Sequence, residues 1–270
     1  MILFPPAKLN LGLQIIAKRS DGYHDLQTVF YQFPLKDVLE IIEDSSLVPG
    51  ECVFKSTGLS IPDGENLCVK AYKLLHEVFT LPGVRIYLHK IIPMGAGLGG
   101  GSSDAAYTLK LLNTLFDLKM SVDELKTYAL ILGSDCPLFV EETPQYAEGR
   151  GELLSKINVE LKGKHLLIVN PNIHISTADA FANISPKLSN SCKYIVDNDL
   201  KSWEADLVND FEKFVIPNHP ELADIKEKFY LMGADYAAMS GSGSTMFGIF
   251  SDPIPDADWP AHYFVWQSVL

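Results

Sequence analysis

The sequence feature that most constrains the fold is a glycine-rich run, PMGAGLGGGSS, at residues 93–103. It holds five glycines and two serines in eleven residues. Glycine loses more conformational freedom on folding than any other residue, so a run this dense indicates backbone that adopts special dihedral angles or approaches another group closely. The segments on either side show what the run could approach.

The run lies between a predicted strand and a predicted helix. Residues 84–91, VRIYLHKI, alternate apolar and polar side chains as a strand does, and residues 105–116 carry apolar side chains at helical spacing. The first amides of a helix have no intrahelical partner, and the helix dipole adds positive potential there. A strand, a glycine loop and a helix start together predict a site for an anion such as phosphate.

Three other interpretations of the run compete with a phosphate site. It is not a Walker A loop, because no Lys-Ser/Thr pair follows the glycines. The spacing Gly95-x-Gly97-x-x-Gly100 matches the dinucleotide fingerprint, but residues 121–132 then read as a second helix where that fingerprint needs a strand ending in an acid. A flexible linker is the third alternative, although linkers rarely join a well-formed strand to a well-formed helix.

The remaining sequence predicts a mixture of strands and helices, with a turn at 20–25 and a capping box at Ser121–Glu124. Strands are expected at 9–16, 26–33, 37–43, 84–91, 165–171, 236–239, 245–250 and 262–270. Helices are expected at 66–79, 105–116, 121–132, 178–183, 202–214 and 220–232. The pattern changes near residues 149–163, which suggests a domain boundary there.

Charge and cysteine content narrow the class of protein. The net charge of −12 argues against a general binder of nucleic acid or anionic membranes. The N-terminal apolar stretch is too short for a signal peptide, and no apolar run approaches the ~18 residues of a membrane span. The cysteines lie far apart without a metal-ligand pattern, which is typical of unpaired thiols in the cytoplasm. They are Cys52, Cys68, Cys136 and Cys192.

Several blocks of sequence resemble the GHMP kinases. They are PAKLNLGLQI (6–15), RSDGYHDLQTVF (19–30), PMGAGLGGGSSDAA (93–106), LGSDCPLFV (132–140) and MSGSGSTMFGIF (239–250). The blocks come in the order of that family and reach nearly from one end of the chain to the other. The triple glycine followed by Ser-Ser is most similar to the branch in the non-mevalonate (methylerythritol phosphate) isoprenoid pathway, whose acceptor carries a cytidine diphosphate group.

The resemblance implies an α+β fold in two parts with the active site in the cleft. The N-terminal part, residues 1–155, would be ribosomal-protein-S5-domain-2-like and carry the ATP loop, and the C-terminal part, residues 156–270, would be ferredoxin-like. The implied activity is ATP- and Mg²⁺-dependent phosphorylation of the 2-hydroxyl of a cytidyl diphosphate-linked methylerythritol. No acidic residue is assigned as a Mg²⁺ ligand.

The resemblance also implies which residues bind ATP. The loop would wrap the phosphates with backbone N–H groups, and its serines would add hydroxyls to a phosphate or to Mg²⁺. The loop residues are Pro93, Met94, Gly95, Ala96, Gly97, Leu98, Gly99, Gly100, Gly101, Ser102 and Ser103. The adenine would lie near Asn66 and Lys90, although Lys90 also fits an ordinary exposed strand residue. Asp104, where some family members have Asn, would place a negative charge near the phosphates.

Lys8 and Asp135 would form the catalytic pair by the same resemblance. An aspartate can accept the proton of the acceptor hydroxyl while a nearby ammonium stabilises the developing charge. Asn10 would point to the same side of an extended segment as Lys8 and contact substrate. From the residues alone, Lys8 also fits a solvated lysine, and Asp135 also fits a cap for the next helical turn.

The acceptor would be bound by the Asp-Gly-Tyr-His turn, Phe181 and the second glycine loop. Tyr23 and Phe181 would stack on the cytosine and His24 would bind its hydrogen-bonding edge. Gly241, Ser242 and Gly243 would contact substrate or phosphate. Phe181 also fits a core aromatic on an amphipathic helix, and the second glycine loop also fits a plain hairpin turn.

Two rival functions remain at this point. One is another small-molecule kinase of the same fold, such as a homoserine or mevalonate-type enzyme, against which the Tyr-His turn and the Asp-x-Pro motif argue. The other is a ligand sensor that has lost catalysis. The presence of both Lys8 and Asp135 argues against a sensor, because a sensor need not keep them.

Overall fold

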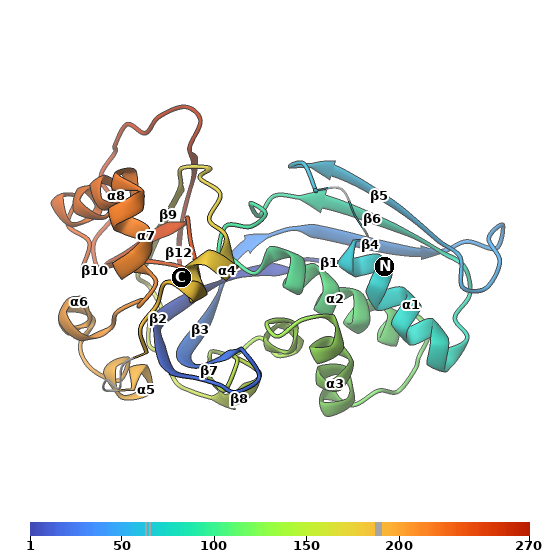
Figure 1. Cartoon of the computed structure of the whole chain (residues 1–270). Coiled ribbons are helices and arrows are strands. Elements are labelled where there is room, and N and C mark those ends of the chain that lie inside the picture. The colour runs from blue at the N-terminus through green and yellow to red at the C-terminus, as the bar shows by residue number, and fades with distance from the viewer. Residues whose placement is uncertain (63, 65, 187–190) are drawn as a thin grey trace. The chain divides into compact units, whose positions relative to one another are not determined.

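The computed structural model describes residues 1–62, 64, 66–186 and 191–270 (Figure 1). The chain forms two compact units, each built from segments that are separate in the sequence. The first comprises Met1–Ala7, Leu35–Met94 and Gly99–Glu142, and the second comprises Lys8–Pro34, Gly95–Leu98 and Thr143–Leu270. The two units are thus interleaved along the chain. The predicted division into residues 1–155 and 156–270 follows the N- and C-terminal domains of the family and not these compact units. That division stays a prediction.

The first unit is a four-stranded sheet with helices on one face (Figure 1). Its strands, in spatial order, are β1 (Ile2–Leu3), β4 (Val38–Glu43), β6 (Val84–Lys90) and β5 (Cys52–Gly58). Its helices are α1 (Leu67–Phe79), α2 (Gly100–Leu115), α3 (Val122–Leu132) and the 3₁₀ turn η1 (Cys136–Val140). β5 and β6 run parallel with α1 between them in the sequence, so a single crossover connects them.

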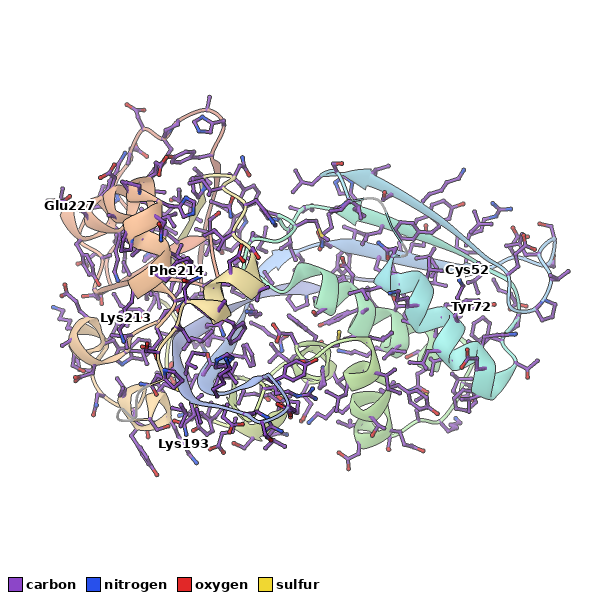
Figure 2. The ribbon with its side chains drawn as sticks, in the orientation of Figure 1. Cys52, Tyr72, Lys193, Lys213, Phe214 and Glu227 are labelled. Carbon is purple, nitrogen blue, oxygen red and sulfur yellow. The ribbon has the colours of Figure 1, made fainter. Side chains whose placement is uncertain are left out.

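Local sequence signals define the helices of this unit. The Asn66 side chain accepts a hydrogen bond from Cys68 N at 2.8 Å and so caps the start of α1. Tyr72 on α1 is fully buried, donates to Pro82 O at 2.6 Å and lies near Cys52 of β5 (Figure 2). Ser121 closes a full capping box at the start of α3, as its spacing to Glu124 predicts.

The second unit contains two antiparallel sheets. One has the order β2 (Pro6–Lys18), β3 (His24–Lys36), β7 (Gln145–Glu148) and β8 (Leu153–Lys156). The other has the order β10 (Tyr236–Met239), β11 (Met246–Phe250), β9 (His165–Asn170) and β12 (Phe264–Val269). In chain order the second sheet reads 2-3-1-4, which is the strand order of a ferredoxin-like sheet. Residues 251–263 are irregular where that fold usually has its second crossover helix.

The second unit also contains several short helices. They are α4 (Thr177–Ala182), α5 (Cys192–Ile195), η2 (Leu200–Ser202), α6 (Trp203–Asp206), α7 (Glu212–Asn218) and α8 (Pro220–Leu231). A core of buried apolar side chains joins α7 and α8 to the strands, and it includes Val169, Phe211, Val215, Leu222, Phe229, Ala237 and Met246. Burial of this apolar surface is what stabilises helices of such short length.

The structure confirms the α+β class and the expected strands. It corrects the helix expected at 202–214, because α6 ends at Asp206 and α7 begins at Glu212. Two buried side chains in the gap bind distant main chain: Asn209 Nδ2 donates to Met239 O at 2.7 Å and to Gly241 O at 2.8 Å, and Asp210 Oδ2 accepts from Ile15 N at 2.9 Å. These tertiary bonds replace helical ones.

Two expectations from composition can be compared with the structure. All four cysteines lie within the described residues and are free thiols. Within the same part of the chain, no helix is long and apolar enough to cross a membrane.

Removal of the α3 cap tests how much this local signal stabilises the first unit. We expect Ser121→Ala to lower the free energy of unfolding by about 1 kcal/mol, because the Glu124 amide loses its side-chain acceptor. Thr127→Ala, exposed on the same helix, is the matched control and should leave stability equal or slightly higher. Chemical denaturation measures both, and equal stabilities for the two variants would contradict the capping role.

Candidate functional site

The glycine loop leads from the end of β6 into the first turn of α2. Gly95, Gly97 and Gly99 have φ of 63°, 77° and 71°, in the left-handed region that favours glycine. Gly99 is the N-cap of α2, so the cap offers no side-chain acceptor to the amides of the first turn. These amides lie at the N-terminus of a 16-residue helix. The helix dipole adds positive potential there, so the position favours binding of an anion.

In the second unit, the first glycine loop lies directly against the second. A Cβ at Gly97 would lie 2.0 Å from the carbonyl oxygen of Ser240, so no side chain fits there. Ser240 Oγ donates to Gly97 O at 2.8 Å, and Thr245 N donates to Ala96 O at 3.4 Å. The second loop is a β10–β11 hairpin, as one alternative held, and it also supports the first loop.

Lys8 and Asn10 lie side by side on β2, as their spacing predicts. Both are buried, with 3% and 2% of their surface exposed, and Lys8 Nζ donates to Asn10 Oδ1 at 2.5 Å. Asn10 Nδ2 donates to Thr28 Oγ1 at 3.0 Å, and Thr28 Oγ1 donates to Gly12 O at 2.5 Å. Asn10 N also donates to Ser240 Oγ at 3.4 Å, so Ser240 contacts both this network and the glycine loop. The solvated alternative for Lys8 is wrong.

Asp135 lies in the first unit, at the N-cap position of η1. Its side chain makes no capping hydrogen bond to that turn, all of which is described, so the geometry does not support the helix-cap alternative. The next residue, Cys136, shares a side-chain hydrogen bond with Ser102 at the start of α2, and burial raises the pKa of its thiol to about 12. Asp135 is thus anchored close to the part of the glycine loop that belongs to the first unit. The pairing of Asp135 with Lys8 stays a prediction.

Lys90 is not an exposed strand residue. It is 1% exposed, and its ammonium contacts Asp37 Oδ2 and, at 2.8 Å, Asp104 Oδ2. Asp104 is therefore paired inside the unit, although its sequence position suggested an uncompensated charge near the phosphates. Asp37 was not among the predicted residues. A lone aspartate before a strand carries no sequence signal that it pairs with a buried lysine.

The residues expected to bind the acceptor lie together in the second unit. The His24 and Phe181 rings stack at 5.2 Å with an interplanar angle of 20°, and Phe181 meets Phe211 edge-on at 4.8 Å. Burial, helped by Lys18, lowers the pKa of His24, which favours the neutral imidazole. Phe181 also packs against the buried core, so the core alternative describes part of its environment.

Tyr23 and the second glycine loop extend this region. Tyr23 is 55% exposed, and the Arg150 guanidinium lies 4.9 Å from its ring centroid. Arg150 was not predicted to lie beside Tyr23, because no motif surrounds it in the sequence. Ser242 Oγ lies 2.9 Å from Thr177 Oγ1 in the first turn of α4, the helix that carries Phe181.

Comparison with known proteins identifies the family. Residues 66–141 match the model for the GHMP kinases N-terminal domain, and residues 191–257 match the GHMP kinases C-terminal model. A protein of Bacteroides fragilis named 4-diphosphocytidyl-2-C-methyl-D-erythritol kinase is 51% identical over 93% of this chain and 92% of its own length. The chain belongs to the 4-diphosphocytidyl-2-C-methyl-D-erythritol kinase family.

Further members of the 4-diphosphocytidyl-2-C-methyl-D-erythritol kinase family agree with this assignment. The protein of that name from Bacteroides thetaiotaomicron is 46% identical, with full coverage of both chains. The crystal structure of a 4-(cytidine 5′-diphospho)-2C-methyl-D-erythritol kinase superposes with a TM-score of 0.81 at 31% identity, covering 99% of this chain and 98% of that one. Membership of the GHMP kinases implies that ATP is the phosphate donor.

The contact between the two glycine loops can be tested directly by a substitution at Gly97. We expect Gly97→Ala to lower the free energy of unfolding by more than about 2 kcal/mol, because a side chain there combines a left-handed backbone with a clash against Ser240 O. Gly101→Ala in the same loop is the control, since its Cβ would meet only side chains at 3.8 Å. Thermal and chemical denaturation of both variants measure the difference, and equal stability would show that the loops do not touch at Gly97.

Proposed function

We propose that this chain transfers the γ-phosphoryl group of ATP to the 2-hydroxyl of 4-diphosphocytidyl-2-C-methyl-D-erythritol, with Mg²⁺ as cofactor. The observation that carries the choice of acceptor is the stacked His24–Phe181 pair, because the structure brings together the two rings that the family resemblance implies for the cytosine end of the substrate. The curated relatives with this name support the same choice.

The nucleotide would be held by the glycine loop and the start of α2. Backbone amides there would bind the phosphates, with Ser102 and Ser103 adding hydroxyls. Ser103 Oγ is buried and has no hydrogen-bond partner among the described residues, which fits a group that awaits a ligand. Asn66 remains predicted to lie near the adenine, whereas the Lys90 ammonium is buried and paired with Asp37 and Asp104, so its side chain is not placed to bind the base.

The residues present also fit Mg²⁺ that arrives with the nucleotide. Within the described parts of the chain, no group of three or more His, Cys, Asp or Glu side chains is arranged to hold a metal ion. Mg²⁺ is usually held by one or two carboxylates together with substrate phosphates, so such a cage is not required. When bound, it would neutralise charge on the transferred phosphoryl group.

Proton transfer would be the task of Asp135 and Lys8. The acceptor oxygen would form a bond to the γ-phosphorus, the bond from that phosphorus to the β-γ bridging oxygen would break, and ADP would leave. Asp135 would accept the hydroxyl proton, and the Lys8 ammonium would stabilise the negative charge on the reacting oxygens. The hydrogen bond from Lys8 to Asn10 supports a fixed position for that ammonium.

The cytosine would be read by the edge of His24. Because Phe181 covers a face of the imidazole, the ring nitrogens at its edge are the groups suited to reach the base. A neutral imidazole has one donor and one acceptor, and the cytosine edge offers the matching acceptor and amino donor. Tyr23, and the glycines and serine of the 241–243 loop, would complete the acceptor site.

The partner is therefore a small molecule with a cytidine diphosphate group, and we propose neither a nucleic-acid nor a membrane partner. The acidic net charge supports this, since nucleic acids and anionic membranes both repel an acidic protein. We place the reaction in the cytoplasm, where ATP is abundant and where four free thiols stay reduced.

A single assay tests the proposed function. Release of ADP is measured with purified protein, ATP and 4-diphosphocytidyl-2-C-methyl-D-erythritol, and separately with homoserine and with mevalonate. We expect turnover with the first acceptor alone. Turnover with homoserine or mevalonate, or with none of the three, would contradict the proposal.

Asp135→Asn should reduce kcat on the order of 10²-fold or more, because the amide cannot accept the hydroxyl proton. ATP affinity, measured by calorimetry, should change little. Asp117→Asn, an exposed carboxylate in the same unit, is the control and should keep full activity. An Asp135→Asn protein with normal turnover but a lower melting temperature would assign Asp135 a structural role only.

The uridine analogue of the acceptor should be a poor substrate. Uracil places an acceptor and a protonated ring nitrogen where cytosine has a donor and an acceptor, so buried groups would lose partners at about 1–3 kcal/mol each. His24→Ala should reduce the preference, whereas Tyr23→Ala should weaken both analogues alike through lost stacking. Steady-state kinetics of the three proteins decide this, and a preference that persists in His24→Ala would place the cytosine reader elsewhere.

A further inference from the structure

The first unit holds a buried cluster of three charged side chains close to the two ends of the glycine loop. Lys90 is the last residue of β6, Asp37 directly precedes β4, and Asp104 lies in the second turn of α2. The side chains of Lys90 and Asp37 are fully buried, and that of Asp104 is 4% exposed. The ammonium contacts both carboxylates. One cation therefore connects three elements of the unit.

The position of this cluster in the sequence is as informative as its burial. Lys90 lies three residues before the glycine loop begins at Pro93, and Asp104 follows directly after the loop ends at Ser103. Asp37 Oδ1 also accepts from Ile91 N at 2.5 Å and from Ile92 N at 2.9 Å, the residues that lead into the loop. The cluster thus holds the chain on both sides of the loop.

Two glycines approach Lys90 so closely that neither could carry a side chain without displacing a neighbouring atom. A Cβ at Gly100 would lie 2.8 Å from Lys90 Nζ and 2.9 Å from Ile92 Cγ2. The carbonyl of Lys90 accepts from Leu59 N at 2.8 Å, and a Cβ at Gly58 would lie 2.2 Å from that oxygen. The ammonium and the main-chain carbonyl of Lys90 therefore both make contacts inside the unit.

We propose that Lys90 is a positioning residue, whose ammonium ties the two ends of the glycine loop together through Asp37 and Asp104 and so sets the affinity for ATP. This rests on the proposed function, in which the loop binds the nucleotide phosphates. Fixing the loop ends holds the backbone amides in the geometry that the phosphates need, and a displacement of about 1 Å can cost about 10²-fold in such a site.

Titration of Asp104 gives an independent check on the burial of this cluster. Burial raises the pKa of Asp104 to about 7, although Lys90 lowers it, and its Oδ1 is buried with no hydrogen-bond partner in the described chain. The groups facing it are Lys90, Asp37 and the Cys68 thiol of α1, whose pKa burial raises so far that it stays neutral. Burial opposes the charge of Lys90, but Asp104 and Asp37 raise its pKa above the ordinary value.

The sign of the pH effect follows from this raised pKa. Between pH 4 and 7 the folded protein holds a proton on Asp104 that the unfolded chain releases, so this group stabilises the fold at low pH and the contribution is lost as the pH rises to about 7. We expect Asp104→Asn to remove that part of the slope of unfolding free energy against pH. An unchanged slope would show that Asp104 is not the buried, paired group described here.

The decisive experiment measures ATP dissociation constants by calorimetry, together with the KM for each substrate. We expect Lys90→Met and Asp104→Leu to raise the ATP dissociation constant on the order of tenfold or more, with the KM of the acceptor nearly unchanged. Asp104→Asn should keep ATP affinity within about twofold, because its amide oxygen still accepts from the ammonium. Arg85→Met is the matched control, since Arg85 pairs with Asp44 at the opposite end of β6.

The outcomes separate the alternatives. Loss of affinity in Lys90→Met but not in Asp104→Leu would mean that Lys90 contacts the nucleotide itself, which overturns the positioning role. Normal affinity in both variants also overturns it, whereas failure of the unmutated protein to bind ATP removes the proposed function as well. A loss in Arg85→Met equal to that in Lys90→Met would assign the effect to general destabilisation.

A variant that removes all three charges of the cluster controls for misfolding of the single variants. The triple variant Lys90→Met, Asp37→Asn, Asp104→Leu keeps an acceptor for the amides of Ile91 and Ile92 and replaces the ion cluster with largely apolar packing, which buried ion pairs often tolerate. We expect it to fold and to bind ATP about tenfold or more weakly than the unmutated protein. Normal ATP binding by this folded variant would overturn the proposal.

Discussion

A buried positive charge needs a negative partner, and the first unit is organised around one such charge at Lys90. Leaving an ammonium unpaired in the interior costs several kcal/mol, so the chain must bring carboxylates to it. They come from the residue before β4 and from α2, which fixes the start of that strand, the end of β6 and the start of the helix relative to one another. The glycine loop leaves the first unit after Met94 and re-enters it at Gly99, close to these fixed points.

The second unit holds its share of the loop by a different means. There the contact is between main chains, with Gly97 against the carbonyl of Ser240 and with one hydroxyl bridging to Asn10 N. The groups that meet in this contact are uncharged. The same hydroxyl lies beside the Lys8–Asn10 pair, which gives the proposed catalytic ammonium and the loop a shared support.

Local signals allowed much of the fold to be predicted, and tertiary partners explain the failures. The strand–loop–helix at 84–116 and the cap at Ser121 depend on neighbours within a few residues, so periodicity and capping rules suffice. The helix expected at 202–214 failed because Asn209 binds main chain about thirty residues away. Lys90 looked exposed because its partner Asp37 is 53 residues distant. The proposed roles of Lys8, Asp135 and Tyr23 came from family resemblance, since no spacing rule marks them.

The close approach at Gly97 also limits how this protein can evolve. Two loops whose backbones touch cannot accept side chains or insertions independently, because a change in one displaces the other. Substitutions tolerated in the 239–250 block should then depend on the length and glycine content of the 93–103 block. A chimera that exchanges only one of the two blocks with a distant relative would inherit a steric mismatch, whereas exchange of both together would preserve the fit.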